Sequence, residues 1–302
     1  MNLLTAYKRG FSQTLPLQRM VAAIYAILLL FALAIAIQAA SVMQALIGDS
    51  LEIDKLLSGY DHTVISDLRH VHGEALGVVT AQIKWVLLLY LLALVGIRGG
   101  MIALLRDTPP GTRSLRSFWA GSYRHYFPFL RLGILMLGLQ LLTAVAVFVP
   151  FGWIVSKSIG PGFTERGVIL SALPVLLLFL ALLSFLMTVS QYAHARLSRP
   201  GKPRIGHSMW AAFQMVLRHP GKTWGLFLFN VGTLLPLSLL YLLLSHAVGM
   251  SGSFTIALGF LIQQAFVYAR ILAKVINWAS ALHMEAHLNP EEAWPEFAEA
   301  SA

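Results

Sequence analysis

Six long apolar runs separated by short polar connections dominate this chain. They are roughly Val21–Leu46, Trp85–Leu105, Phe127–Val155, Val168–Ala195, Trp224–Val248 and Phe254–Ile276. Each run meets or exceeds the ~20 residues with which a helix crosses ~30 Å of hydrocarbon. Hydrophobic residues make up 57% of the 302 positions and charged residues only 12%, too few to cover the surface of a soluble protein. The sequence therefore predicts an all-α membrane protein with six transmembrane helices.

Lys and Arg are distributed unevenly between the connections. The N-terminal segment, the second and fourth connections and the C-terminal end hold 17 of the 22. Because Lys and Arg favour cytoplasmic loops, both termini are predicted to be cytoplasmic. A cleavable signal peptide is the alternative for the first run. The uncharged stretch after Arg19 is longer than the ~7–15 apolar residues of such a peptide, so we expect an uncleaved span.

The formal charge of +9 has two readings. Basic proteins often bind nucleic acid, but these cations flank membrane spans, where anionic headgroups attract each of them by ~1 kcal/mol. We therefore expect anionic phospholipids as partners and no nucleic acid. The candidate headgroup-binding residues are Arg113, Arg116, Arg124, Arg204, Arg218 and Lys222.

A unit of about a hundred residues is repeated three times in one membrane domain, at residues 1–105, 106–200 and 201–288, before an acidic cytoplasmic tail at 289–302. Each unit begins with a basic amphipathic segment that leads into two spans. Apolar residues at spacings of three and four in Ser114–Phe127 and Ile205–Leu217 predict helices lying in the membrane plane. The alternative is that basic and aromatic residues simply recur at membrane boundaries.

Small residues and prolines give further expectations about the spans. Small residues that recur every four positions predict close helix contacts, and they are Ala32, Ala36 and Ala40 on the first span and Gly96 and Gly100 on the second. Pro174 and Pro236 predict kinks or broken hydrogen bonds. The long outer connection, about Gly48–Ile83, is predicted to form a helical hairpin or to extend the flanking spans.

Polar residues within the spans are the candidate site. They are Gln263, Arg270, Lys274 and Asn277 on one face of the sixth helix, Gln191 and His194 on the fourth, and Asn230 on the fifth. Together they predict a polar, cation-bearing pocket open to the cytoplasm or to lipid. The alternative is interhelical hydrogen bonding, with the Arg270 and Lys274 side chains extended toward the headgroups. No Asp or Glu lies within a span, which argues against a transporter coupled to ions through a buried carboxylate.

The sequence offers little evidence of catalysis. The chain has no cysteine, which excludes disulfides, cysteine-bound zinc, iron–sulfur clusters and thiol catalysis. Histidine groups are the remaining candidates for a metal site, and they are His283 and His287 with Glu285, and His62, His70 and His72 with Asp67 and Glu74. We interpret both groups as surface histidines and expect no metal, no cofactor and no enzymatic activity. An intramembrane metal enzyme is the alternative.

The segment from Val216 to Leu226, with Trp210 before it and Ala269-Arg270 in the last span, resembles a bacterial six-helix membrane domain. That domain occurs alone and also fused to some glycerophosphodiester phosphodiesterases, whose catalytic barrel is missing here. The resemblance implies a bacterial inner-membrane protein linked to lipids. We expect a non-enzymatic protein that binds a lipid or other amphiphile, or that supports a complex as a homo-oligomer or hetero-complex subunit. A permease subunit working with a separate ATPase is the alternative.

Overall fold

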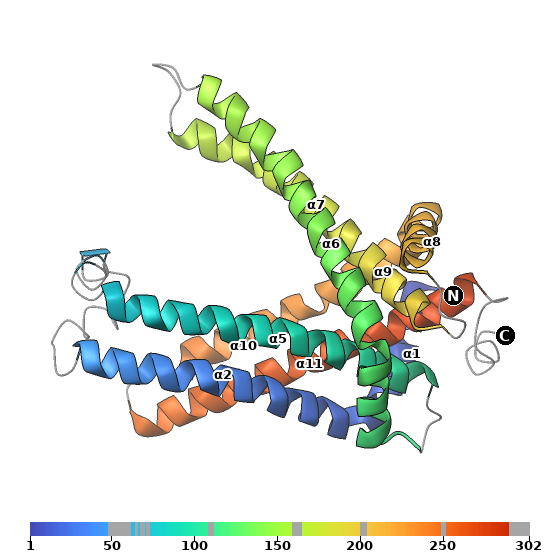
Figure 1. Ribbon diagram of the computed structural model, residues 1–302, viewed down its shortest axis with the longest axis horizontal. Coiled ribbons are helices and arrows are strands. Elements are labelled where there is room, and N and C mark those ends of the chain that lie inside the picture. Colours follow the sequence, from blue (N-terminus) through green and yellow to red (C-terminus); the bar gives the residue numbers. More distant parts are fainter. Residues whose placement is uncertain are drawn as a thin grey trace. The chain divides into compact units, whose positions relative to one another are not determined.

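The computed structural model describes residues 1–47, 62–63, 66, 70, 73–107, 112–158, 165–199, 204–248 and 252–289, which form helices and turns without any strand (Figure 1). Within these residues, six helices are long and apolar enough to cross a membrane. The six spans predicted from the sequence are therefore confirmed as helices. The acidic residues of the predicted tail lie outside the described residues.

The helices in chain order are α1 (Leu3–Thr14), a 3-10 turn η1 (Leu15–Leu17), α2 (Gln18–Ile47), α5 (Gly73–Asp107), α6 (Leu115–Ser158), α7 (Glu165–Leu197), α8 (Ile205–Arg218), α9 (Pro220–Gly232), α10 (Leu234–Val248) and α11 (Ser253–Leu288). The start of α5 at Gly73 extends the second span into the first connection, which corresponds to one of the two alternatives predicted for that connection. Because α1 and α8 are separate from the spans that follow them, two of the three predicted amphipathic helices are distinct elements.

The second predicted amphipathic helix is not a separate element. It forms the first turns of α6, which continues through Pro128 into the third span. A proline removes one backbone hydrogen bond from a helix, but Phe118 on one side and Phe129 and Leu132 on the other are buried. Packing on both sides of Pro128 therefore keeps the helix continuous.

The two prolines predicted to disturb spans behave differently. Helix α9 ends at Gly232 and α10 begins at Leu234, because Pro236 has no N–H to donate to the Gly232 carbonyl group. The Thr233 hydroxyl group at the break donates to the Asn230 carbonyl oxygen at 2.7 Å. Pro174, in contrast, lies within an α7 helix that is assigned without interruption. Only the break near Pro236 is confirmed.

The chain forms two compact units. The hairpin unit is Ala22–Leu94, and the main unit combines Met1–Val21 with Val95–Ala302. In the hairpin unit, the rings of Phe31 on α2 and Tyr90 on α5 meet edge to face at 6.0 Å. The alanines predicted to support close packing of α2, at positions 32, 36 and 40, are exposed in the described chain. Close packing of α2 through these alanines stays a prediction.

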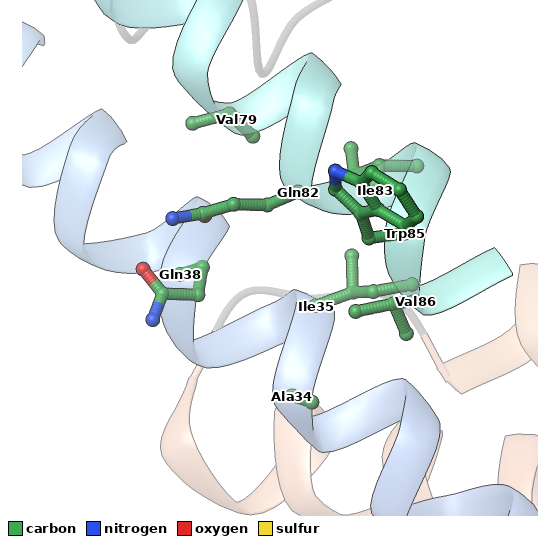
Figure 2. A pocket seen from close by; sticks show the side chains of 8 residues that line it. All are labelled: Ala34, Ile35, Gln38, Val79, Gln82, Ile83, Trp85 and Val86. Carbon is green, nitrogen blue, oxygen red and sulfur yellow. The ribbon is translucent and has the colours of Figure 1, made fainter. Parts of the chain in front are cut away.

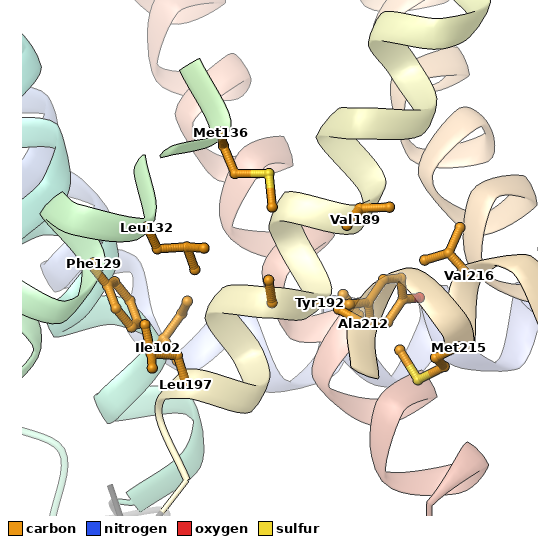
Figure 3. Close-up of a cluster of buried hydrophobic side chains, with 12 residues drawn as sticks. Ile102, Phe129, Leu132, Met136, Val189, Tyr192, Leu197, Ala212, Met215 and Val216 are labelled. Atoms are coloured by element: carbon orange, nitrogen blue, oxygen red, sulfur yellow. The ribbon is translucent and has the colours of Figure 1, made fainter. Parts of the chain in front are cut away.

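A cluster of buried side chains forms the core of the main unit (Figure 3). In Figure 3, Ile102 of α5 lies beside Phe129 of α6 and Leu197 of α7. On the other side of α7, Tyr192 lies near Met215 of α8. A second cluster joins α1, α9 and α11 through Ala6, Leu226 and Met284. The amphipathic helices α1 and α8 are therefore packed into the main unit by their apolar faces.

Two helix contacts in the main unit leave no room for a side chain. A β-carbon placed on Gly10 of α1 would lie 2.3 Å from the Ser280 hydroxyl oxygen of α11 and 2.7 Å from the Ser280 backbone nitrogen. A β-carbon on Gly100 of α5 would lie 2.7 Å from the Phe118 ring of α6. The predicted close contact of the second span through Gly100 is confirmed, and its neighbour is the start of α6.

The outer parts of several spans expose apolar side chains. Helix α10 has no buried residue, and Leu142 of α6 is 63% exposed while Leu177 of α7 is 59% exposed. Soluble proteins rarely expose contiguous apolar surface on this scale. Hydrocarbon is the solvent that fits these faces, in agreement with the length of the helices.

Candidate functional site

A buried carboxylate surrounded by three arginines joins α5, α7 and α11. Glu285 is 1% exposed. Its Oε1 atom accepts a hydrogen bond from Arg199 Nη2 at 2.5 Å and lies 3.8 Å from Arg196 Nε, while its Oε2 atom lies 3.9 Å from Arg106 Nη2. We call this group the arginine cage. Its charges leave an excess of positive charge beside the carboxylate.

Arg106 is the most deeply buried cation of the arginine cage. Its side chain is 4% exposed, and its Nη1 atom donates to the Ala195 carbonyl oxygen and, at 2.9 Å, to the Ser198 hydroxyl oxygen. Arg106 thus closes the C-terminal end of α7, where carbonyl groups lack helical partners. The arginine cage thus links α5, α7 and α11 through one carboxylate.

The sequence interpretation missed the arginine cage because its members are far apart in the chain. One signal was present. Asp107 and Glu285 are the only acidic residues in the predicted cytoplasmic segments before the tail. A lone carboxylate among many arginines favours an ion-pair network, although the sequence does not say which arginines form it.

The predicted polar stripe divides into separate contacts. The Gln191 side-chain amide of α7 donates to the Asn277 carbonyl oxygen of α11 at 2.8 Å and to Asn277 Oδ1 at 3.1 Å. These two residues therefore bridge two helices, which corresponds to the interhelical alternative. The Trp224 indole N–H of α9 makes a similar bridge to the Ser184 hydroxyl oxygen of α7 at 3.0 Å.

His194 and Asn230 are buried and make local contacts. His194 Nδ1 lies 2.6 Å from the Ser190 carbonyl oxygen, one turn earlier in α7, and the His194 ring meets Phe129 edge to face at 4.8 Å. Asn230 Nδ2 donates to the Leu226 carbonyl oxygen at 2.9 Å. Neither side chain joins the Gln191–Asn277 bridge in the described contacts.

The remaining stripe residues, Gln263, Arg270 and Lys274, are exposed on α11. Arg270 Cζ lies 5.7 Å from the centre of the Phe266 ring, and Lys274 Nζ lies 5.7 Å from the centre of the Trp278 ring. The Arg98 guanidinium of α5 lies 5.9 Å from the same Trp278 ring. Arg98 and Lys274 thus lie near one ring, and the sequence interpretation did not connect Arg98 with the stripe.

Most predicted headgroup-binding cations are exposed, namely Arg116, Arg124, Arg204, Arg218 and Lys222. Arg113 is half-buried and donates to the Gln13 carbonyl oxygen at 3.4 Å. Three aromatic side chains lie exposed on the same segments, with Trp119 at 55%, Tyr123 at 84% and Trp210 at 57%. We call the exposed cations and aromatic residues of α6, α8 and α9 the collar. Arg124 Nη1 lies 3.8 Å from Asp107 Oδ2, and because the Arg124 side chain is exposed, this ion pair contributes little to stability.

The histidine groups do not converge on a common point in the described structure. Glu285 belongs to the arginine cage, and His287 Nε2 makes a hydrogen bond with the Met1 amino group. His62 and His70 are exposed, whereas His72 and Asp67 lie outside the described residues. Over the ranges that the structure describes, no three His, Asp or Glu side chains are placed to hold a metal ion.

The hairpin unit contains a pocket of about 300 Å³ between α2 and α5 (Figure 2). Apolar side chains line most of it, including Ile35, Val86 and the exposed Trp85, and the amides of Gln38 and Gln82 form its polar part. Figure 2 shows the two amides close together on one side. The sequence interpretation missed this pocket because it depends on which faces of two spans meet.

Comparison of the chain with family models, curated proteins and solved structures returns no match.

Proposed function

We propose that this chain is a non-enzymatic protein of the bacterial inner membrane that binds anionic phospholipid at the end that carries the collar. In this proposal six spans cross the membrane, and both termini and the collar face the cytoplasm. The protein holds lipid for itself or for a complex, and it carries out no reaction.

The collar is the observation that carries the proposal. Trp119, Tyr123 and Trp210 expose large rings beside exposed cations, although their helices bury other apolar residues in the core. Exposed Trp and Tyr next to Arg and Lys are typical of segments that lie at the level of the headgroups. Few acidic side chains lie near the collar cations in the described structure, and an anionic membrane surface would balance their positive charge.

Native mass spectrometry of the purified chain tests the proposal. The protein is extracted from membranes that contain phosphatidylglycerol and phosphatidylcholine in equal parts, and the retained lipids are identified. We expect phosphatidylglycerol to be retained in clear preference to phosphatidylcholine. A folded protein that retains neither lipid, or both equally, would contradict the proposed function.

A further inference from the structure

We propose that Arg98, Arg270 and Lys274 form a specific site for a phosphate group between α5 and α11. This inference rests on the proposed function, because it assigns the place at which the phosphate of an anionic lipid binds. A free phosphate ion has the same chemistry, and the experiment below separates the two sources.

One face of α11 carries two cations between two aromatic rings. Phe266, Arg270, Lys274 and Trp278 follow one another at intervals of four residues, which places them in a row on one side of a helix. Each of the two cations lies against one of the two rings, at 5.7 Å in both cases. The aromatic residues thus hold the two charged groups along the row.

The third cation comes from another helix. The Arg98 guanidinium of α5 approaches the same Trp278 ring as Lys274, at 5.9 Å from its centre. The Trp278 ring thus brings cations of two helices together, and Arg270 lies one helical turn before Lys274 on the same face of α11.

These three cations lack an acidic partner among the residues that the structure describes. The ion pairs found there join Arg106, Arg196 and Arg199 to Glu285, and Arg124 to Asp107. Arg98 Nε is also buried without a hydrogen-bond partner in the described chain. A cation over an aromatic face gains only about 0.5–2 kcal/mol, which does not neutralise three like charges. A phosphate group supplies both the charge and the hydrogen-bond acceptors that these side chains lack.

The position along the helices favours a phosphate at the membrane boundary. Lys274 lies 21 residues after the start of α11 at Ser253, which is about 31 Å along the helix and close to the ~30 Å thickness of the hydrocarbon core. Arg270 and Lys274 are exposed whereas Trp278 is 8% exposed. A phosphate group can therefore approach from the side of the two exposed cations, Arg270 and Lys274, while the buried Trp278 ring forms the back of the site.

The test compares two triple variants of the full chain in lipid nanodiscs. One replaces the three site cations (R98Q/R270Q/K274Q), and the matched control replaces three exposed cations that belong neither to the site nor to the collar (K84Q/K157Q/R166Q). Affinity is measured for phosphatidylglycerol, for phosphatidylcholine and for inorganic phosphate. We expect the site variant to lose about a hundredfold in affinity for phosphatidylglycerol, equivalent to about 2.8 kcal/mol, and the control to lose about threefold or less.

A second variant leaves the half-buried Arg98 in place, so a loss of binding in this variant cannot come from misfolding caused by replacing Arg98. R270Q/K274Q changes only exposed side chains and should still lose about tenfold, whereas K274R, which keeps the charge, should bind like the wild type. If the variants lose inorganic phosphate but not the lipid, the site takes a free phosphate ion. If they lose neither, the phosphate site is refuted. A collar variant (R116Q/R204Q/K222Q) that loses phosphatidylglycerol while the site variant keeps it refutes the site but leaves the proposed function intact, and a wild type without preference for phosphatidylglycerol refutes the proposed function.

Discussion

Removing the carboxylate of the arginine cage should destabilise the protein more than any change on its exposed faces. The substitution Glu285→Gln keeps the size of the side chain but leaves Arg106, whose side chain is 4% exposed, without its counter-charge. Breaking a buried ion pair by removing one partner costs about 3–5 kcal/mol. Arg196 and Arg199, at 12% and 14% exposure, still reach water, so the lower end of this range is expected.

Thermal unfolding in detergent, followed by light scattering or tryptophan fluorescence, measures the effect. A loss of about 3 kcal/mol corresponds to a decrease in Tm of about 6 °C or more. The double variant E285M/R106M removes both the carboxylate and its most buried partner, and should recover part of the loss because apolar pairs replace buried ion pairs at little cost. A Tm of Glu285→Gln within about 1 °C of the wild type would refute the view that this carboxylate holds the three helices together.

Two further substitutions test contacts between helices. Gly10→Ala should lower the free energy of unfolding by about 1–3 kcal/mol through overpacking, because the new β-carbon would meet the Ser280 backbone of α11. The control Gly133→Ala, whose β-carbon meets nothing within 4 Å, should be neutral or slightly stabilising in the same melting assay. Equal melting temperatures for the two variants would exclude the close contact. Gln191→Leu removes the two hydrogen bonds to Asn277 and should lower the free energy of unfolding by about 0.6–1.7 kcal/mol, which is measured as a lower Tm. Adding Asn277→Leu to this variant should not lower the Tm further. Additive losses in the double variant would show that the two side chains act separately.

The spans were predictable because hydropathy and length reflect the solvent around each helix. The Pro236 break followed from one missing N–H group. The continuity of α6 through Pro128 could not be predicted from the sequence, because it depends on packing by Phe118, Phe129 and Leu132. The packing of the α2 alanines could not be predicted either, since small residues permit a close helix contact but do not determine which face of the helix makes it.

The polar side chains illustrate what periodicity leaves undetermined. A spacing of three, four and seven residues places Arg270, Lys274 and Asn277 on one face of a helix, but it does not identify what that face meets. Asn277 meets α7 through Gln191, whereas Lys274 shares an indole ring with Arg98. The threefold repeat and the lipid-binding role remain predictions, because neither follows from the helices alone.

The most direct test of the account is the side of the membrane on which the end that carries the collar lies. The chain has no cysteine, so a single introduced cysteine is the one site in the protein that a maleimide reagent can label. Ser12→Cys on α1 and Ser156→Cys near the end of α6 both replace exposed residues. With a membrane-impermeant maleimide on intact spheroplasts, the account predicts that Cys at position 156 is labelled and that Cys at position 12 is labelled only after permeabilisation. Labelling of position 12 and protection of position 156 would contradict it.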